Sequence, residues 1–143
     1  MRITRFEDID AWKAARKLLR LVLEITNSHK FSKRADLKSQ LRRAATSAMA
    51  NIAEGFDSGS DAEFGRFLRI ARKSAREVQS HLYSAVDQNA IDERQFEKVY
   101  GVAEDVRRLI GGFLRYLSAS KPGTTRLETG DRGLETEATC ARL

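Results

Sequence analysis

Apolar residues recur at intervals of three and four along most of the chain, the spacing that places them on one face of an α-helix. This pattern predicts four helices, at about residues 8–27, 32–54, 60–87 and 92–118. The last two begin with signatures of an N-terminal cap, Ser60 followed by Glu63 and Asp92 followed by Gln95. With one proline and no glycine before Gly55, the chain carries few signals for strands and tight turns. The predicted fold class is all-α.

The connections between these helices are short, which makes sequential neighbours antiparallel. We therefore expect an up-down-up-down four-helix bundle over residues 1–120. Gly55 follows the second segment, where we expect it to end the helix in the left-handed conformation. Residues 121–143 show no apolar period and few large apolar side chains, so they are predicted to form a disordered C-terminal tail.

The first predicted helix carries more apolar surface than one bundle core needs. The stripe expected to face the core comprises Ile9, Trp12, Ala15, Leu19, Val22, Leu23 and Thr26. A second stripe lies beside it and comprises Ala11, Ala14, Leu18, Leu21 and Ile25. Because a helix in a monomeric bundle needs an apolar arc of about 100°, we expect the second stripe to pack against another subunit of a homo-oligomer.

The composition fits one folded domain. Of 143 residues, 41% are hydrophobic and 32% are charged, values close to those of globular proteins. No run of about 18 apolar residues occurs, and the N-terminus is acidic where a signal peptide needs an apolar run, so we expect a cytoplasmic protein without membrane contact. A single cysteine, Cys140, supports neither an internal disulfide nor a cysteine-based zinc site. We expect no metal and no other cofactor.

Positive charge is concentrated in the predicted bundle. The formal net charge is +6, and the tail contains four basic and four acidic residues. Cations on the third helix recur at steps of three and four, which puts them on one face: Arg66, Arg69, Lys73 and Arg76. Together with Arg42 and Arg43 on the second helix, they are candidate ligands for nucleic-acid phosphates. The alternative is a solvated face that keeps the protein soluble.

A polar row runs beside the alanine-rich stripe of the second helix: Gln40, Arg43, Ser47, Asn51 and Glu54. Half-buried charges are costly unless they are paired, so we expect Arg43, Asn51 and Glu54 to bond one another or a neighbouring subunit. A structural network or subunit junction is the favoured interpretation of the row, and contact with a ligand is the alternative.

The sequence contains no phosphate-binding glycine loop and no nucleophile motif of a hydrolase. The pair Arg76 and His81 resembles the Arg-x4-6-His motif of all-helical ribonucleases of toxin and defence systems. Five residues along a regular helix separate two side chains by about 140°, so the two would not converge within one chain. We therefore expect no enzymatic activity and keep a ribonuclease as a third hypothesis.

Three segments carry a family resemblance: FEDIDAWKAA at 6–15, QLRRAATSAMANIAEGF at 40–56 and EFGRFLRIARKS at 63–74. Over about residues 1–118 the chain resembles the four-helix-bundle family of proteins encoded within intervening sequences of bacterial 23S ribosomal RNA. The resemblance implies a ring-like homopentamer. It also implies a distant likeness to the basic accessory proteins of diversity-generating retroelements, which engage nucleic acid and a reverse transcriptase. The chain departs from the family pattern at Lys73, where glycine is usual, and at Asn89 and Ala90, where Gly-Tyr is usual.

The leading functional hypothesis is a non-enzymatic, oligomeric protein associated with nucleic acid, with RNA favoured over DNA because of the family's setting. The alternative is a structural or protein-interaction scaffold whose basic surfaces contact an acidic protein. The two differ in salt dependence, because phosphate binding weakens steeply as the salt concentration rises.

Overall fold

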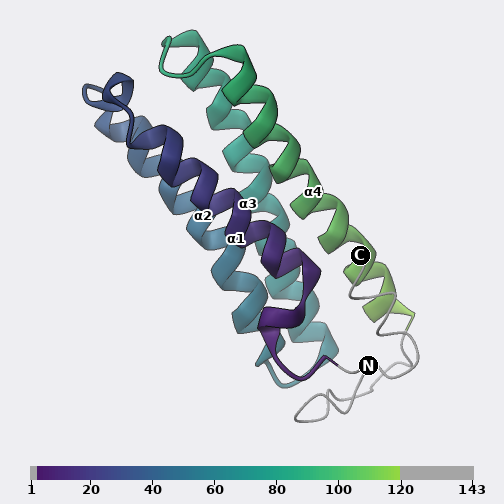
Figure 1. The fold of residues 1–143 in the computed structure, drawn as a ribbon. Coiled ribbons are helices and arrows are strands. Elements are labelled where there is room, and N and C mark those ends of the chain that lie inside the picture. Colours follow the sequence, from purple (N-terminus) through teal and green to yellow (C-terminus); the bar gives the residue numbers. More distant parts are fainter. Residues whose placement is uncertain (1–2, 120–143) are drawn as a thin grey trace.

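A computed structural model describes residues 3–119, which form an antiparallel four-helix bundle (Figure 1). Its helices are α1 (Asp10–Thr26), α2 (Ala35–Phe56), α3 (Asp61–Asp87) and α4 (Glu93–Ser118), with short 3-10 turns at Phe6–Asp8 and His29–Phe31. Sequential helices pack together, and α1 also packs against α4, so the four helices enclose one core. The all-α class and the antiparallel order are confirmed. The predicted tail, 121–143, lies outside the described residues.

Both predicted start signals cap their helices, but within residues 3–119 only the second forms the full reciprocal capping box. Ser60 Oγ accepts a hydrogen bond from the Glu63 backbone N–H at 3.2 Å. At α4 the cap is reciprocal, because Asp92 Oδ1 accepts from Gln95 N–H at 2.8 Å and Gln95 Oε1 accepts from Asp92 N–H at 2.9 Å. Helix α2 begins at Ala35, later than expected, because the 3-10 turn His29–Phe31 precedes it. Within residues 3–119, none of the helices has the length and apolarity that crossing a membrane requires.

The buried face of α1 differs from the predicted one. Leu18 and Ile25, which we expected at a subunit contact, lie in the bundle core with exposed fractions of 0% and 4%. Leu23, which we expected in the core, is 37% exposed. The reason is that α1 packs against both α2 and α4, so the arc they cover is centred between the two predicted stripes. The assignment of Leu18 and Ile25 to a subunit interface is therefore wrong.

Gly55 lies inside α2, whose last residue is Phe56, and does not form the predicted left-handed cap. The C-cap residue Asp57 has an ordinary φ of −85°. A Cβ atom at position 55 would lie 2.7 Å from Phe67 Cβ and 2.8 Å from Phe64 Cδ1, both closer than carbon atoms approach in a packed core. Glycine is needed at this position because α3 crosses α2 closely here.

Asn89, in the connection between α3 and α4, is the non-glycine residue with a positive φ, 59°, among the described residues. Asparagine tolerates this conformation better than most residues, and glycine tolerates it best. The Ala90 backbone N–H reaches back to the Ala85 carbonyl at 2.8 Å, which closes the end of α3. The departure from the family's glycine at this position therefore leaves the turn intact.

Gly55→Ala and Gly101→Ala form a matched pair of tests of the α2–α3 contact. Gly55→Ala should lower the free energy of unfolding by about 1–3 kcal/mol, because the added methyl group overlaps two phenylalanine side chains. Gly101 is exposed within α4, and a Cβ there meets nothing within 4 Å, so Gly101→Ala should raise it by about 0.5–1 kcal/mol. Urea denaturation measures both. Equal effects at the two positions would contradict the close approach.

Leu18→Ala should lower the free energy of unfolding by about 2–5 kcal/mol, as expected for a fully buried leucine. Leu23→Ala should cost much less, because the Leu23 side chain is partly in solvent. Denaturant titration of the two variants separates a core position from a surface position. A Leu18→Ala protein of parental stability that dissociates into smaller species would restore the subunit-contact interpretation.

Candidate nucleic-acid interface

Helix α3 presents the predicted cations together on one side. Arg66, Arg69, Lys73 and Arg76, here called the α3 basic face, are all exposed, and α3 is regular from Asp61 to Asp87. Arg66 Nε donates to Glu63 Oε1 at 2.9 Å, and the guanidinium lies 4.7 Å from the centre of the Phe67 ring. Within residues 3–119, Arg69 and Lys73 are in no ion pair. These two cations are therefore the most available to an anionic ligand.

Arg76 belongs to a polar network that joins α3 to α4. Its Nη1 donates to Gln79 Oε1 at 2.8 Å, and Gln79 Nε2 donates to Glu104 Oε1 at 3.0 Å. Gln79 is 1% exposed, so its amide needs these partners. Arg107 Nη1 completes the network with a 3.2 Å contact to Glu104 Oε1. Arg76 is thus positioned by the protein, with part of its charge facing Glu104.

The network lowers the pKa of Glu104 below the ordinary value for glutamate. The hydrogen bond from Gln79 contributes most to the lowering, and the positive charges of Arg107 and Arg76 add to it, while partial burial opposes it. The carboxylate is therefore favoured over the neutral acid. Gln79 and Glu104 were not predicted from the sequence, because their partners lie on different helices. One signal was present: Gln79 follows the apolar residue Val78, and a glutamine that is buried needs hydrogen-bond partners.

The two arginines assigned to α2 have different environments. Arg42 Nε donates to Thr26 Oγ1 and its Nη2 donates to Asn27 Oδ1, both at 2.8 Å. Arg42 thereby ties α2 to the end of α1, where a cation also interacts favourably with the helix dipole. Arg43 is exposed. Of this pair, Arg43 is the one whose charge is open to solvent.

The polar row of α2 is divided between half-buried positions, Ser47 and Asn51, and exposed ones. Asn51 Nδ2 donates to the Ser47 carbonyl at 2.9 Å and lies 3.0 Å from Ser47 Oγ, which is 2.8 Å from Ser74 Oγ on α3. Ser74, which the sequence did not point to, completes this contact. Gln40, Arg43 and Glu54 are exposed. Within residues 3–119, Arg43, Asn51 and Glu54 therefore do not bond one another, and their contact with a neighbouring subunit stays a prediction.

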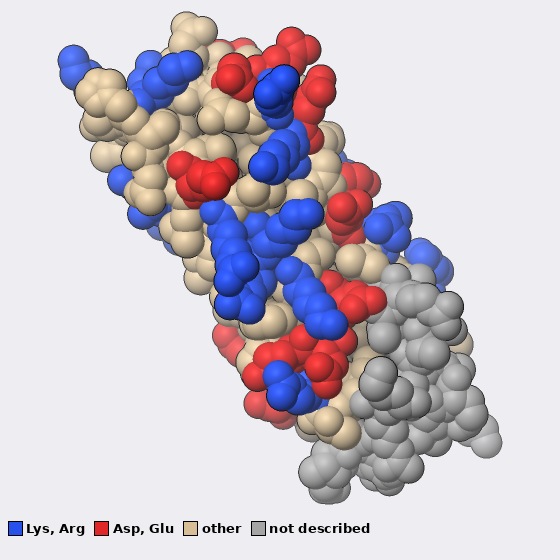
Figure 2. Space-filling view, viewed as in Figure 1, with Lys and Arg blue, Asp and Glu red and all other residues tan. Residues whose placement is uncertain are grey.

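A second concentration of positive charge lies over α1 (Figure 2). Its cations, here called the α1 basic face, are Lys13, Arg16, Lys17 and Arg20. With Trp12 they line a hollow of about 390 Å³. The Arg16 guanidinium lies 5.9 Å from the centre of the Trp12 ring, and Lys13 Nζ is 3.8 Å from Asp10 Oδ1.

Arg76 and His81, the pair considered for ribonuclease chemistry, are not brought together. Arg76 reaches toward Gln79 and α4, whereas His81 Nε2 lies 3.7 Å from Glu77 Oε2. Because α3 is a continuous α-helix over both residues, the separation of about 140° around the helix axis holds.

The lowered pKa of Glu104 predicts a stability contribution that depends on pH. The charged carboxylate is present above its ordinary pKa, and its stabilising effect is lost as the pH falls through the lowered value. Glu104→Gln should therefore lower the melting temperature at neutral pH, with a difference from the parent that shrinks as the pH falls below the ordinary pKa of glutamate. Asp105→Asn, which removes an exposed pair with Arg108, is the control and should have a smaller effect. A Glu104→Gln difference that does not vary with pH would contradict the network.

Comparison with known proteins confirms the resemblance of the three sequence segments. The family model described as 23S rRNA-intervening sequence protein matches residues 7–112. A crystal structure of a protein of unknown function from the S23 ribosomal protein family of Bacteroides thetaiotaomicron is similar, with a TM-score of 0.61 and 26% identity over 71% of this chain and 98% of that chain. No curated protein matches the chain. Because the family model covers well over half of its length, the chain belongs to the 23S rRNA-intervening sequence protein family.

Proposed function

We propose that this protein is a non-enzymatic, self-associating helical bundle that binds nucleic acid through the α3 basic face. The supporting observation is the exposure of all four cations of this face on one side of a regular helix. Such a face can follow a line of phosphates, because lysine and arginine neutralise phosphate charge and release counterions. The α2–α3 contact at Gly55 holds this helix in place, so the cations are presented from a rigid element.

The four cations contribute to binding in different ways. Arg69 and Lys73 contact phosphates first, since they have no ion-pair partner among the described residues. The pair of Arg66 with Glu63 is exposed, and exposed pairs are weak enough to be exchanged for a phosphate. Arg76 is oriented by Gln79. Arg43 on α2 is a further candidate, whereas Arg42 is engaged with α1.

RNA is the favoured nucleic acid because the family is named for sequences that interrupt 23S ribosomal RNA. The resemblance also implies five subunits, which remains a prediction. Symmetric repetition would multiply the positive field of one face without any new residue. A protein-interaction scaffold is the second candidate function, and it is favoured by a hollow between α3 and α4 that is lined by Tyr83, Phe96, Glu93 and Glu97 among others. The geometry of Arg76 and His81 does not favour ribonuclease activity.

Replacing the α3 basic face by glutamine tests the nucleic-acid proposal. The variant Arg66→Gln, Arg69→Gln, Lys73→Gln and Arg76→Gln should bind a labelled single-stranded RNA more weakly than the parent. The slope of log K against log salt should shrink by about 0.7–0.9 for each phosphate that the variant no longer neutralises. Glutamine is a good helix former, so the helix content should be retained. Fluorescence anisotropy across a salt series measures the slope, with a DNA of the same sequence in parallel.

The matched control removes four charges from α4: Arg94→Gln, Lys98→Gln, Arg108→Gln and Arg115→Gln, all of them exposed. The net charge changes equally in the two variants. If the α3 basic face has a specific role, the control should retain the parent's affinity for RNA and its slope of log K against log salt. Equal reductions in both variants would show attraction by net charge alone. Unchanged binding by the α3 variant would remove this face from the proposal.

A further inference from the structure

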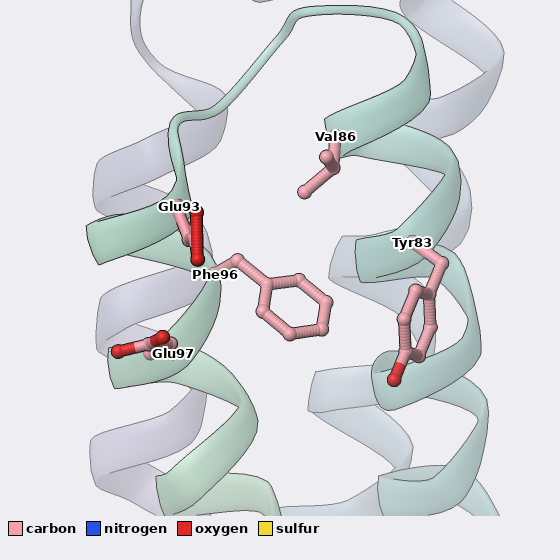
Figure 3. Close-up of a pocket in the computed structure, with 5 residues that line it drawn as sticks. All are labelled: Tyr83, Val86, Glu93, Phe96 and Glu97. Atoms are coloured by element: carbon pink, nitrogen blue, oxygen red, sulfur yellow. The ribbon is translucent and has the colours of Figure 1, made fainter.

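A hollow of about 240 Å³ lies where the end of α3 meets the start of α4 (Figure 3). Tyr83 and Val86 of α3 and Glu93, Phe96 and Glu97 of α4 line it, and the Phe96 ring reaches toward Tyr83. We call this hollow the aromatic pocket. It lies at the opposite end of α3 from Arg66 and Arg69, so it is distinct from most of the α3 basic face.

The aromatic pocket combines exposed rings with unpaired acids. Tyr83 is 56% exposed, and its ring centre lies 4.9 Å from that of Phe96 and 6.1 Å from that of Tyr100. Glu93 and Glu97 are both exposed, and within residues 3–119 neither is in an ion pair. They are four residues apart on one helix, a spacing at which like charges repel. Ring faces together with carboxylates attract a lysine ammonium or an arginine guanidinium.

The α1 basic face has the complementary chemistry. Lys17 and Arg20 are exposed and in no ion pair among the described residues, and Trp12 and Leu23 add apolar surface on the same helix. Within residues 3–119 the exposed large hydrophobic side chains are Leu23, on the same helix as the α1 basic face, and Tyr83, in the aromatic pocket. Each surface therefore offers both a charge and an apolar area that the other can cover.

Within residues 3–119, Lys17 and Arg20 form no ion pair with Glu93 or Glu97. Helix α1 packs against α2 and α4, and α3 packs against the same two helices, so α1 and α3 occupy diagonal positions in the bundle. Both surfaces point away from the core. A second molecule can therefore bring the complementary charges together.

We propose that the aromatic pocket of one copy of this chain receives the α1 basic face of a second copy, with Lys17 and Arg20 near the Glu93 and Glu97 carboxylates. The contact joins two different surfaces, so it is heterologous and, when repeated, produces a ring or an open filament. This inference rests on the self-association in the proposed function and names the surfaces that make it. The α3 basic face remains open to nucleic acid.

Charge reversal tests this pairing in nuclease-treated protein, so that nucleic acid does not bridge the copies. Two double variants are compared: Glu93→Lys with Glu97→Lys, and Lys17→Glu with Arg20→Glu. Each should weaken self-association and so raise its Kd at least about tenfold. A chain that carries all four changes should regain association, because its two surfaces are again complementary. Sedimentation velocity over a concentration series measures the Kd, and melting temperatures verify folding.

The control Asp57→Lys with Asp105→Lys makes the same charge change as the reversal of Glu93 and Glu97, at exposed positions outside both surfaces, and should leave the Kd unchanged. A monomeric parent would overturn both the self-association and this pairing. If the parent associates and neither reversal changes its Kd, the pairing alone is overturned. If reversing the pocket abolishes association but reversing the α1 basic face does not, the pocket binds a different cation and the pairing is overturned. The pairing is also overturned if the variant with all four changes does not regain association.

Discussion

Helix α2 lies close to α3, and small residues on the buried side of α2 permit this approach. Ala44, Ala45 and Ala48 are buried on α2, and Gly55 leaves room for Phe64 and Phe67 of α3. The Phe64 ring lies 6.2 Å from that of Phe56 and 5.1 Å from that of Phe113. One side chain of α3 thereby contacts α2 and α4 at once, and the opposite side of α3, which carries the cations, is turned to solvent.

Local signals were sufficient to predict the helices. The caps at Ser60 and Asp92 depend on residues three positions apart, so a single sequence contains the whole interaction. The buried face of α1 was predicted wrongly because periodicity identifies which residues share a face but does not identify which helices cover its flanks. Gly55 was recognised as important for the wrong reason, since a clash with Phe67 depends on a helix that crosses it rather than on its own φ.

In the candidate site too, the features set by local spacing were predictable and those set by contacts between helices were not. Helical steps were enough to group Arg66, Arg69, Lys73 and Arg76, which α3 displays together. Contacts between helices were not predictable in this way: Arg76 reaches Glu104 through Gln79, and Arg42 reaches Asn27. Tyr83 and Phe96 likewise form a pocket because α3 and α4 are antiparallel neighbours. Counting charges therefore located the basic surface but did not show which cations the protein itself already uses.

Lysine footprinting tests most directly the claim that α3 is the surface that meets nucleic acid. Lys73 of the α3 basic face and Lys98 of α4 are both exposed, so both should react with an acetylating reagent in the free protein. The account predicts that added RNA slows acetylation of Lys73, as mass spectrometry would show, and leaves that of Lys98 unchanged. Two results would contradict the claim: RNA protects Lys98 but not Lys73, or RNA is bound and protects neither lysine.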